Sequence, residues 1–185
     1  MEPGLVMHGG TAIWRCYNGN RFSEDIDLYA TDEQMKTLDK ELTWALSKRD
    51  VKLDYPKISM RVVTFHDEFA SSKLEAMKPE KKVASVEKEF ERANGSRFFI
   101  NTLSAEDLII EKVYTYQKRR FIRDFYDIYH LLDMAKQTTK VKRALSSLVE
   151  NIEAPIKGQN LSDLVYIGIA PSFGTMLNRI KGKLE

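Results

Sequence analysis

The sequence has little that would support crosslinking, membrane insertion or strong global charge. Its single cysteine, Cys16, excludes an internal disulfide and a multi-cysteine zinc site, and suits a reducing compartment such as the cytoplasm. No apolar run approaches the ~18 residues that a membrane helix needs, and no secretory signal begins the chain. The 29 basic and 27 acidic residues leave a net charge of +2, so any basic surface must be local.

What is present is an ordinary globular composition. The chain has 185 residues, of which 43% are hydrophobic and 30% charged, enough to bury a sizeable core. Strand-like segments are frequent in the first half, and helical spacing dominates after Thr102. We therefore predict an α+β fold, with an α+β unit over residues 1–101 and a helical carboxy-terminal lobe over 102–185.

Local patterns predict the individual elements. We expect strands at 4–7, 22–30, 51–53, 57–65, 82–90 and 97–100, and helices at 11–17, 33–48, 126–134, 141–152 and 161–180. Residues 69–82 are charged and ambiguous. Ser104 begins a capping box before an apolar helical pattern, whereas Pro171 and Gly174 should break or kink the last helix.

Two short motifs near the start suggest chemistry. Gly9 and Gly10 precede a short helical segment, so backbone amides there can approach an anion, and Thr11 adds a hydroxyl. Asp25 and Asp27 lie two residues apart on an expected strand, so both carboxylates project from one face. Paired carboxylates favour a hard divalent cation, most simply Mg²⁺ bridging to phosphates.

Either motif alone is common by chance, and alone each fits a glycine turn or an exposed Asp-x-Asp at a strand end. Together, in the order strand, Gly-Gly-Thr, helix, turn and Asp-x-Asp strand, they are far more specific. A phosphate cradle beside a dicarboxylate metal site is what nucleotidyl transfer needs.

The segments His8–Ala12 and Arg21–Leu28 resemble the nucleotidyltransferase family of AbiEii/AbiGii-type toxins. This family also includes the MenT toxins and belongs to the polymerase-β superfamily. Glu111-Lys112 and Arg123–Tyr129 are similar to the family's helical motifs, so the resemblance spans roughly Val6 to Leu132. Family members usually carry a helical segment before the glycine motif, so this chain is either a minimal member or lacks such a leader.

The resemblance implies a polymerase-β-type core with a mixed sheet and a helical lobe. It also implies transfer of a nucleotide from a nucleoside triphosphate, dependent on Mg²⁺ or Mn²⁺, to RNA (the 3′ end of tRNA) or to a protein hydroxyl. The expected setting is a cytoplasmic toxin of a toxin–antitoxin or phage-defence system, with an antitoxin protein as partner and no membrane association.

The resemblance also assigns roles to residues. The expected nucleotide-binding residues are Gly9, Gly10, Thr11, Ser23, Lys112 and Arg123, and the expected catalytic residues are Asp25, Asp27, Lys112 and Asp124. Asp25 and Asp27 would hold the metal, with a third carboxylate from a later strand. Glu87, in an apolar strand shortly before Ser104, is our candidate, and Glu89 shares its face.

Other interpretations stay open. Most basic residues between Lys112 and Arg123 also fit a solvated helix face with aromatic residues in the core. A non-catalytic nucleotide- or partner-binding module is favoured if no third carboxylate reaches Asp25 and Asp27, and a phosphotransfer regulator of an antitoxin is a third class. The nucleotide, the acceptor and the oligomeric state are not determined by these residues.

Overall fold

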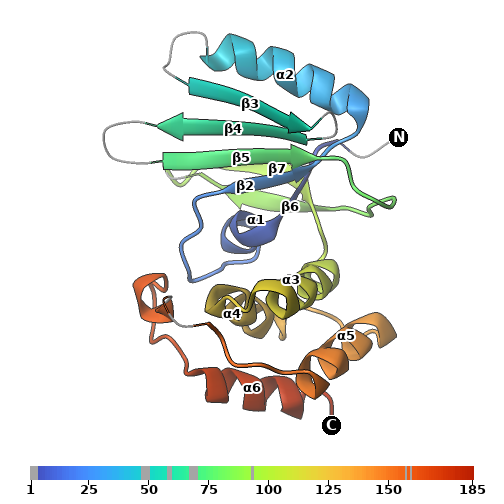
Figure 1. Cartoon of the computed structure of the whole chain (residues 1–185), viewed down its shortest axis with the longest axis vertical. Helices are drawn as coiled ribbons and strands as arrows, with labels where there is room; N and C mark the ends of the chain where they lie inside the picture. Colours follow the sequence, from blue (N-terminus) through green and yellow to red (C-terminus); the bar gives the residue numbers. More distant parts are fainter. Residues whose placement is uncertain are drawn as a thin grey trace. The chain divides into compact units, whose positions relative to one another are not determined.

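The computed structural model describes residues 4–46, 51–57, 60–66, 71–92, 94–156, 158 and 160–185. The chain forms two compact units, the first comprising Met1–Ala12 and Ser23–Leu103 and the second Ile13–Phe22 and Ser104–Glu185 (Figure 1). The expected boundary between residues 101 and 102 thus lies close to the observed one, where the chain leaves the first unit at Leu103 and enters the second at Ser104. Residues 13–22, expected in the first unit, belong to the second, where the backbone NH of Phe22 donates to the carbonyl of Leu164 at 2.9 Å.

The first unit is built on one sheet. Over the described residues, seven strands run in the order β3-β4-β5-β2-β1-β7-β6, and both parallel and antiparallel pairs occur. The predicted mixed sheet is therefore confirmed. The strands are β1 (Val6–His8), β2 (Ile26–Tyr29), β3 (Val51–Lys57), β4 (Met60–His66), β5 (Ser71–Met77), β6 (Val86–Glu91) and β7 (Arg97–Thr102).

Helix α2 (Asp32–Leu46) covers one face of this sheet (Figure 1). Leu38 and Leu42 of α2 pack against a buried cluster of strand residues, Leu28, Val63, Leu74 and Ala76. Because side chains alternate along a strand, the neighbours of these core residues on β2 and β5 project from the opposite face.

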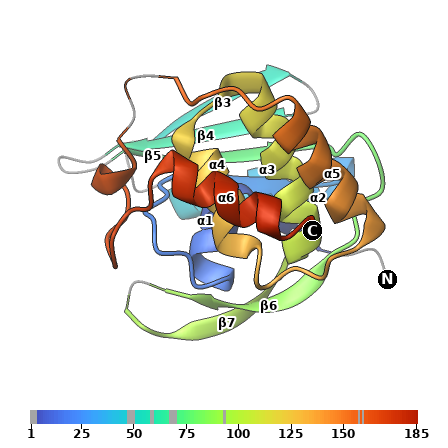
Figure 2. The same ribbon diagram turned by 90° about the horizontal axis from the view of Figure 1, so that it is seen from below.

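Strand β5 lies where the sequence was ambiguous. It pairs in parallel with β2 and antiparallel with β4, so it occupies the interior of the sheet. Its charged residues obscure the strand pattern, and only the two neighbouring strands fix it in place. At the other end of the sheet, β6 and β7 form the long hairpin at the lower edge of Figure 2.

The second unit is helical. Its helices are α3 (Ala105–Arg119), α4 (Ile122–Leu131), α5 (Thr139–Glu150), the short 3₁₀ helix η1 (Leu161–Asp163) and α6 (Phe173–Gly182), and α1 (Gly9–Cys16) begins in the first unit and ends here. α3 packs against α4 and α5, and α6 packs against both of these (Figure 2). Among the described residues, no helix has the length and apolar character required to cross a membrane.

The helix boundaries follow local chemistry. Ser104 caps α3, its Oγ accepting from the backbone NH of Asp107 at 3.1 Å, as the capping motif predicted. α3 ends where Arg120 adopts a left-handed conformation, with φ of 53°. The helix expected at 161–180, with a break or kink at Pro171 and Gly174, is interrupted over residues 164–172, whereas Gly174 lies inside a helix. A turn of 3₁₀ helix at Leu161 and a separate α6, which starts after Pro171, replace it.

Candidate functional site

The glycine motif and the second aspartate meet at the junction of β1 and α1. Gly9 begins α1 with a positive φ of 73°, a conformation that favours glycine. A Cβ at Gly9 would lie 2.2 Å from Oδ2 of Asp27, so the carboxylate occupies the space that any other residue's side chain would fill. The pairing of His8 with Asp27 across β1 and β2 sets this approach. Because Gly9 has no side chain, the carboxylate of Asp27 can lie against the amino terminus of α1.

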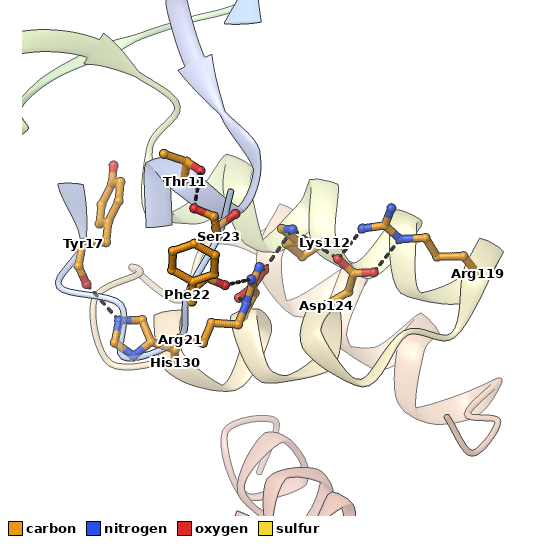
Figure 3. Close-up of polar contacts among 10 residues, drawn as sticks. Thr11, Tyr17, Arg21, Phe22, Ser23, Lys112, Arg119, Asp124 and His130 are labelled. Carbon is orange, nitrogen blue, oxygen red and sulfur yellow. Dashed lines mark hydrogen bonds and ion pairs between the residues drawn. The ribbon is translucent and has the colours of Figure 1, made fainter. Parts of the chain in front are cut away.

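Thr11 has a structural contact beside its expected role at the nucleotide. Its buried hydroxyl donates to the carbonyl oxygen of Asp25 at 2.5 Å. A longer contact of 3.4 Å reaches the carbonyl of Ser23 (Figure 3). From the other side, Ser72 Oγ of β5 donates to the carbonyl of Glu24 at 2.5 Å. Thr11 and Ser72 together fix the segment that presents Asp25.

A third carboxylate lies beside Asp27, and it belongs to Glu75. β2 and β5 run in parallel with Asp27 directly paired with Glu75. Lys73 is two residues before Glu75 on the same face of β5, and its Nζ lies 2.6 Å from Glu75 Oε1. The hydrogen bond with Glu75 is the largest influence that raises the pKa of Lys73, and the charges of Asp25 and Asp27 raise it further. Asp27 and Glu75 are therefore neighbours on one face of the sheet, and Lys73 provides a positive charge beside Glu75.

The expectation that Glu87 supplies a third carboxylate to the metal site is wrong, because Glu87 lies on a distant strand. Glu87 lies on β6, at the edge of the sheet, paired with Asn101 of β7. Strands β7 and β1 separate β6 from β2, which places Glu87 about 14 Å from the strand of Asp27 at the usual strand spacing. Glu89, on the same exposed strand, pairs instead with Arg97. The order of strands in the sheet, which no local pattern encodes, decides against both.

The donor set fits a hard divalent cation that a nucleotide helps to hold. In the described parts of the chain, no three acidic, histidine or cysteine side chains are gathered closely enough to hold a metal by themselves. Mg²⁺ usually takes one or two protein carboxylates and completes its shell with water and substrate phosphates. Asp25 and Asp27 are both partly exposed, and Asp27 lies against the glycine turn. Two such carboxylates next to a helix amino terminus match that requirement.

Lys112, which was expected at the phosphates, belongs to a buried ionic network of the helical unit. Lys112 Nζ lies 3.1 Å from Asp124 Oδ1 and 2.8 Å from Asp127 Oδ2. Asp124 also accepts two hydrogen bonds from Arg119, at 2.7 and 2.8 Å (Figure 3). The side chain of Lys112 is 6% exposed, and those of both aspartates are fully buried. Asp124 is therefore shared between Lys112 and Arg119, and its catalytic role stays a prediction.

Three members of this network, Arg21, Arg119 and Asp127, were not among the expected site residues. Arg21 makes a bidentate pair with Asp127, with both N···O distances 2.6 Å, and donates to the carbonyl of Phe22 at 2.9 Å. Asp127 follows Asp124 by three residues on α4, so the two carboxylates share one helix face. That spacing, and the arginine directly before the Phe-Ser-Glu-Asp segment, were the signals available in the sequence.

Electrostatics keep the network charged despite burial. Burial alone would raise the pKa of Asp127, but Arg21 and Lys112 outweigh it and hold this pKa below 3.8. Burial alone would likewise lower the pKa of Lys112, but Asp127 and Asp124 raise it above 10.5. Buried charges persist only when they are paired in this way.

Arg123 is placed apart from these contacts. α3 ends at Arg119, and after it Arg123 lies over the ring of Phe121, 5.3 Å from its centroid, while Arg119 lies over the same ring at 4.9 Å. Arg15 similarly lies 3.6 Å from the ring centroid of Trp14. The unit thus presents arginine–aromatic pairs beside its buried network.

Comparison with known proteins connects this geometry to a family. The model of the family "Nucleotidyl transferase AbiEii toxin, Type IV TA system" matches residues 1–164. MenT4, the nucleotidyltransferase toxin Rv2826c from Mycobacterium tuberculosis H37Rv, has a similar fold, with a TM-score of 0.65, 17% identity, and coverage of 99% of this chain and 75% of that one. JHP933 from Helicobacter pylori is similar with a TM-score of 0.57, 16% identity and coverage of 99% and 86%. No curated protein matches this chain.

Proposed function

Because this chain belongs to the AbiEii family of nucleotidyl transferase toxins and is a nucleotidyltransferase, we propose that it transfers a nucleotide from a nucleoside triphosphate to a hydroxyl of RNA. The acceptor oxygen attacks the α-phosphorus, and the bond from that phosphorus to the β-phosphate oxygen breaks. Pyrophosphate leaves, and the hydroxyl proton passes to solvent or a carboxylate. The reaction belongs in the cytoplasm, which supplies both tRNA and triphosphates.

The observation that carries this proposal is the close approach of the Asp27 carboxylate to Gly9. It joins a carboxylate suited to a divalent cation and a helix amino terminus suited to phosphate at a single point of the fold. The amides of Gly9 and Gly10 would approach the triphosphate, and Asp25 and Asp27, with Glu75 beside them, would hold Mg²⁺ or Mn²⁺. When bound, that ion neutralises charge on the phosphates and activates the attacking hydroxyl.

RNA is the acceptor that we favour, with the 3′ end of tRNA as the first substrate to test. The arginine–aromatic pairs of the second unit, Arg15 with Trp14 and Arg123 with Phe121, combine a phosphate-binding cation with a ring on which a base can stack. Membership of a toxin–antitoxin family further supports a toxin role countered by an antitoxin. A protein hydroxyl is an outcome that the experiment distinguishes.

The test measures transfer of each labelled nucleotide to purified tRNA, total RNA and lysate protein, with Mg²⁺, Mn²⁺ or EDTA. We expect metal-dependent label in RNA, reduced at least ~100-fold by Asp27→Asn while the melting temperature in EDTA falls by no more than a few degrees. Asp32→Asn is the matched control, because Asp32 is an exposed acid paired with Lys78 on the same unit.

Three results would contradict the proposal. Label only in protein would exclude an RNA acceptor. Transfer that survives Asp27→Asn at the parental rate would remove Asp27 from the site. Stabilisation by metal and triphosphate without transfer to any acceptor would indicate a nucleotide-binding module.

A further inference from the structure

Lys73 holds a position that a divalent cation would also favour. Its ammonium group contacts Glu75 at 2.6 Å, on the sheet face that also bears Asp27, and Asp27 is the direct strand partner of Glu75. Both contacting side chains are partly exposed, Lys73 at 38% and Glu75 at 24%, so the ion pair can open without disturbing the core.

The surrounding charges reach the same lysine. Asp27 projects from the same face as Glu75, its direct strand partner, so its carboxylate is a neighbour of the Lys73–Glu75 pair. Without a cation, the neighbouring carboxylates of Asp27 and Glu75 would repel each other. The lysine provides the compensating charge from within the chain.

From this geometry we infer that Lys73 is an internal competitor of the catalytic metal, a positioning residue whose ammonium group must leave Glu75 before a divalent cation binds at Asp25 and Asp27. Lys73 then sets the metal concentration that the site requires and keeps the carboxylates arranged in its absence. This inference rests on the proposed metal site, and it concerns metal affinity without reference to any acceptor.

The physical magnitude is sufficient for a clear effect. A positive charge within a few ångströms of a divalent ion repels it, and this repulsion is reduced by solvent and by movement of the flexible side chain. We therefore expect removal of the charge to tighten metal binding by about tenfold.

The experiment is a titration of the full chain with Mn²⁺, followed by electron paramagnetic resonance of the free ion, in the absence of nucleotide. Lys73→Met retains the length of the side chain and removes its charge, and it should lower the Mn²⁺ dissociation constant about tenfold. Lys73→Arg should restore parental affinity, because it keeps a cation beside Glu75. Lys78→Met is the control, since Lys78 lies just beyond β5 and pairs with exposed Asp32.

A second measurement separates competition from a general structural role. In EDTA, Lys73→Met should melt at a lower temperature than the parent, because the neighbouring carboxylates of Asp27 and Glu75 lose their compensating charge, and saturating Mn²⁺ should remove that difference. A merely structural lysine would give a deficit that Mn²⁺ does not correct.

The outcomes distinguish this inference from the proposed function. Equal Mn²⁺ affinity of Lys73→Met and the parent, with affinity lost in Asp27→Asn, would overturn the role of Lys73 and leave the metal site intact. Absence of Mn²⁺ binding in the parent and in both Lys73 variants would overturn the inference and the proposed metal site together. Tighter binding by Lys73→Met in a protein that transfers nothing to RNA would support the inference while the proposed function fails.

Discussion

Each unit of this protein contains a lysine surrounded by carboxylates, and the two clusters differ in their access to solvent. In the sheet unit, Lys73 and Glu75 are partly exposed at 38% and 24%. In the helical unit, Lys112 is 6% exposed, and its partners Asp124 and Asp127 are fully buried. Both clusters pair a lysine with carboxylates, but solvent reaches the cluster in the sheet unit and is excluded from the one in the helical unit.

Because of this difference in solvent access, the same type of ion pair has different energetic consequences in the two units. A partly exposed ion pair contributes ~0–1 kcal/mol and can exchange one cation for another. A buried pair cannot exchange, because removal of one partner leaves an uncompensated charge in a medium of low dielectric. The sheet cluster is therefore suited to binding, whereas the helical cluster holds residues 13–22 and α4 in one unit through Arg21 and Asp127.

The largest expected effect comes from breaking the buried cluster. Asp127→Ala removes the shared partner of Arg21 and Lys112, and should lower the free energy of unfolding by ~3–5 kcal/mol. Urea denaturation measures this loss. Asp133→Ala is the control, because Asp133 is 56% exposed and pairs with Arg179 and Lys183 at the surface, where we expect a loss of ~0–1 kcal/mol. Similar losses in the two variants would contradict the contrast between the clusters.

Lys112→Ala tests whether the buried cluster also serves transfer. The family resemblance predicts a phosphate contact, and removal of such a cation should reduce turnover ~100-fold. Asp124→Ala should reduce turnover as well, because Asp124 holds Lys112 at 3.1 Å. Transfer is measured well below each variant's melting temperature, so that loss of folded protein does not imitate loss of chemistry. Full turnover in both variants would confine Lys112 and Asp124 to a structural role.

Gly9→Ala tests the candidate metal site in the sheet unit. The added Cβ would fall 2.2 Å from Asp27 Oδ2 at a φ of 73°, so we expect a destabilisation of ~1–2 kcal/mol and loss of Mn²⁺ binding as the carboxylate moves. Gly174→Ala, where a Cβ meets its nearest atom at 3.9 Å, should be neutral or slightly stabilising. Calorimetry with and without Mn²⁺ distinguishes the two, and an unchanged Mn²⁺ response in Gly9→Ala would argue against the close approach of the Asp27 carboxylate to Gly9.

The smallest effect appears at acid pH. The pKa of Asp127 is lower in the folded protein than its ordinary value of 3.8, so its contribution to stability is fully present above that value and is lost as pH falls through the lower, folded pKa. The stability difference between the parent and Asp127→Asn should therefore be constant from pH 7 to about 5 and shrink below about pH 4. Urea midpoints measured across this range check it. A difference that shrinks already near pH 6 would assign the effect to another group.

Prediction from the sequence succeeded where a signal is local. The Gly-Gly-Thr motif, the strand that bears Asp27 and the cap at Ser104 depend on neighbours within a few residues, and each is found in the structure, although the strand begins at Ile26 and leaves Asp25 just before it. It failed where the signal depends on distant partners. The charged residues of the strand Ser71–Met77 hide its alternating pattern. The neighbours of Thr11 in the sequence likewise do not indicate that its hydroxyl donates to the carbonyl of Asp25.

The sequence by itself determined the fold class, the family and the choice of Asp25 and Asp27 as candidate metal ligands, because periodicity and motif order are properties of the chain. Only the tertiary structure decided that Glu75 and not Glu87 lies beside Asp27, because the order of strands is set when several segments bury their apolar faces together. It also decided that Lys112 is buried and Lys73 is not. Solvent access, which controls the strength of every charge, is a property of the packed molecule and not of any segment.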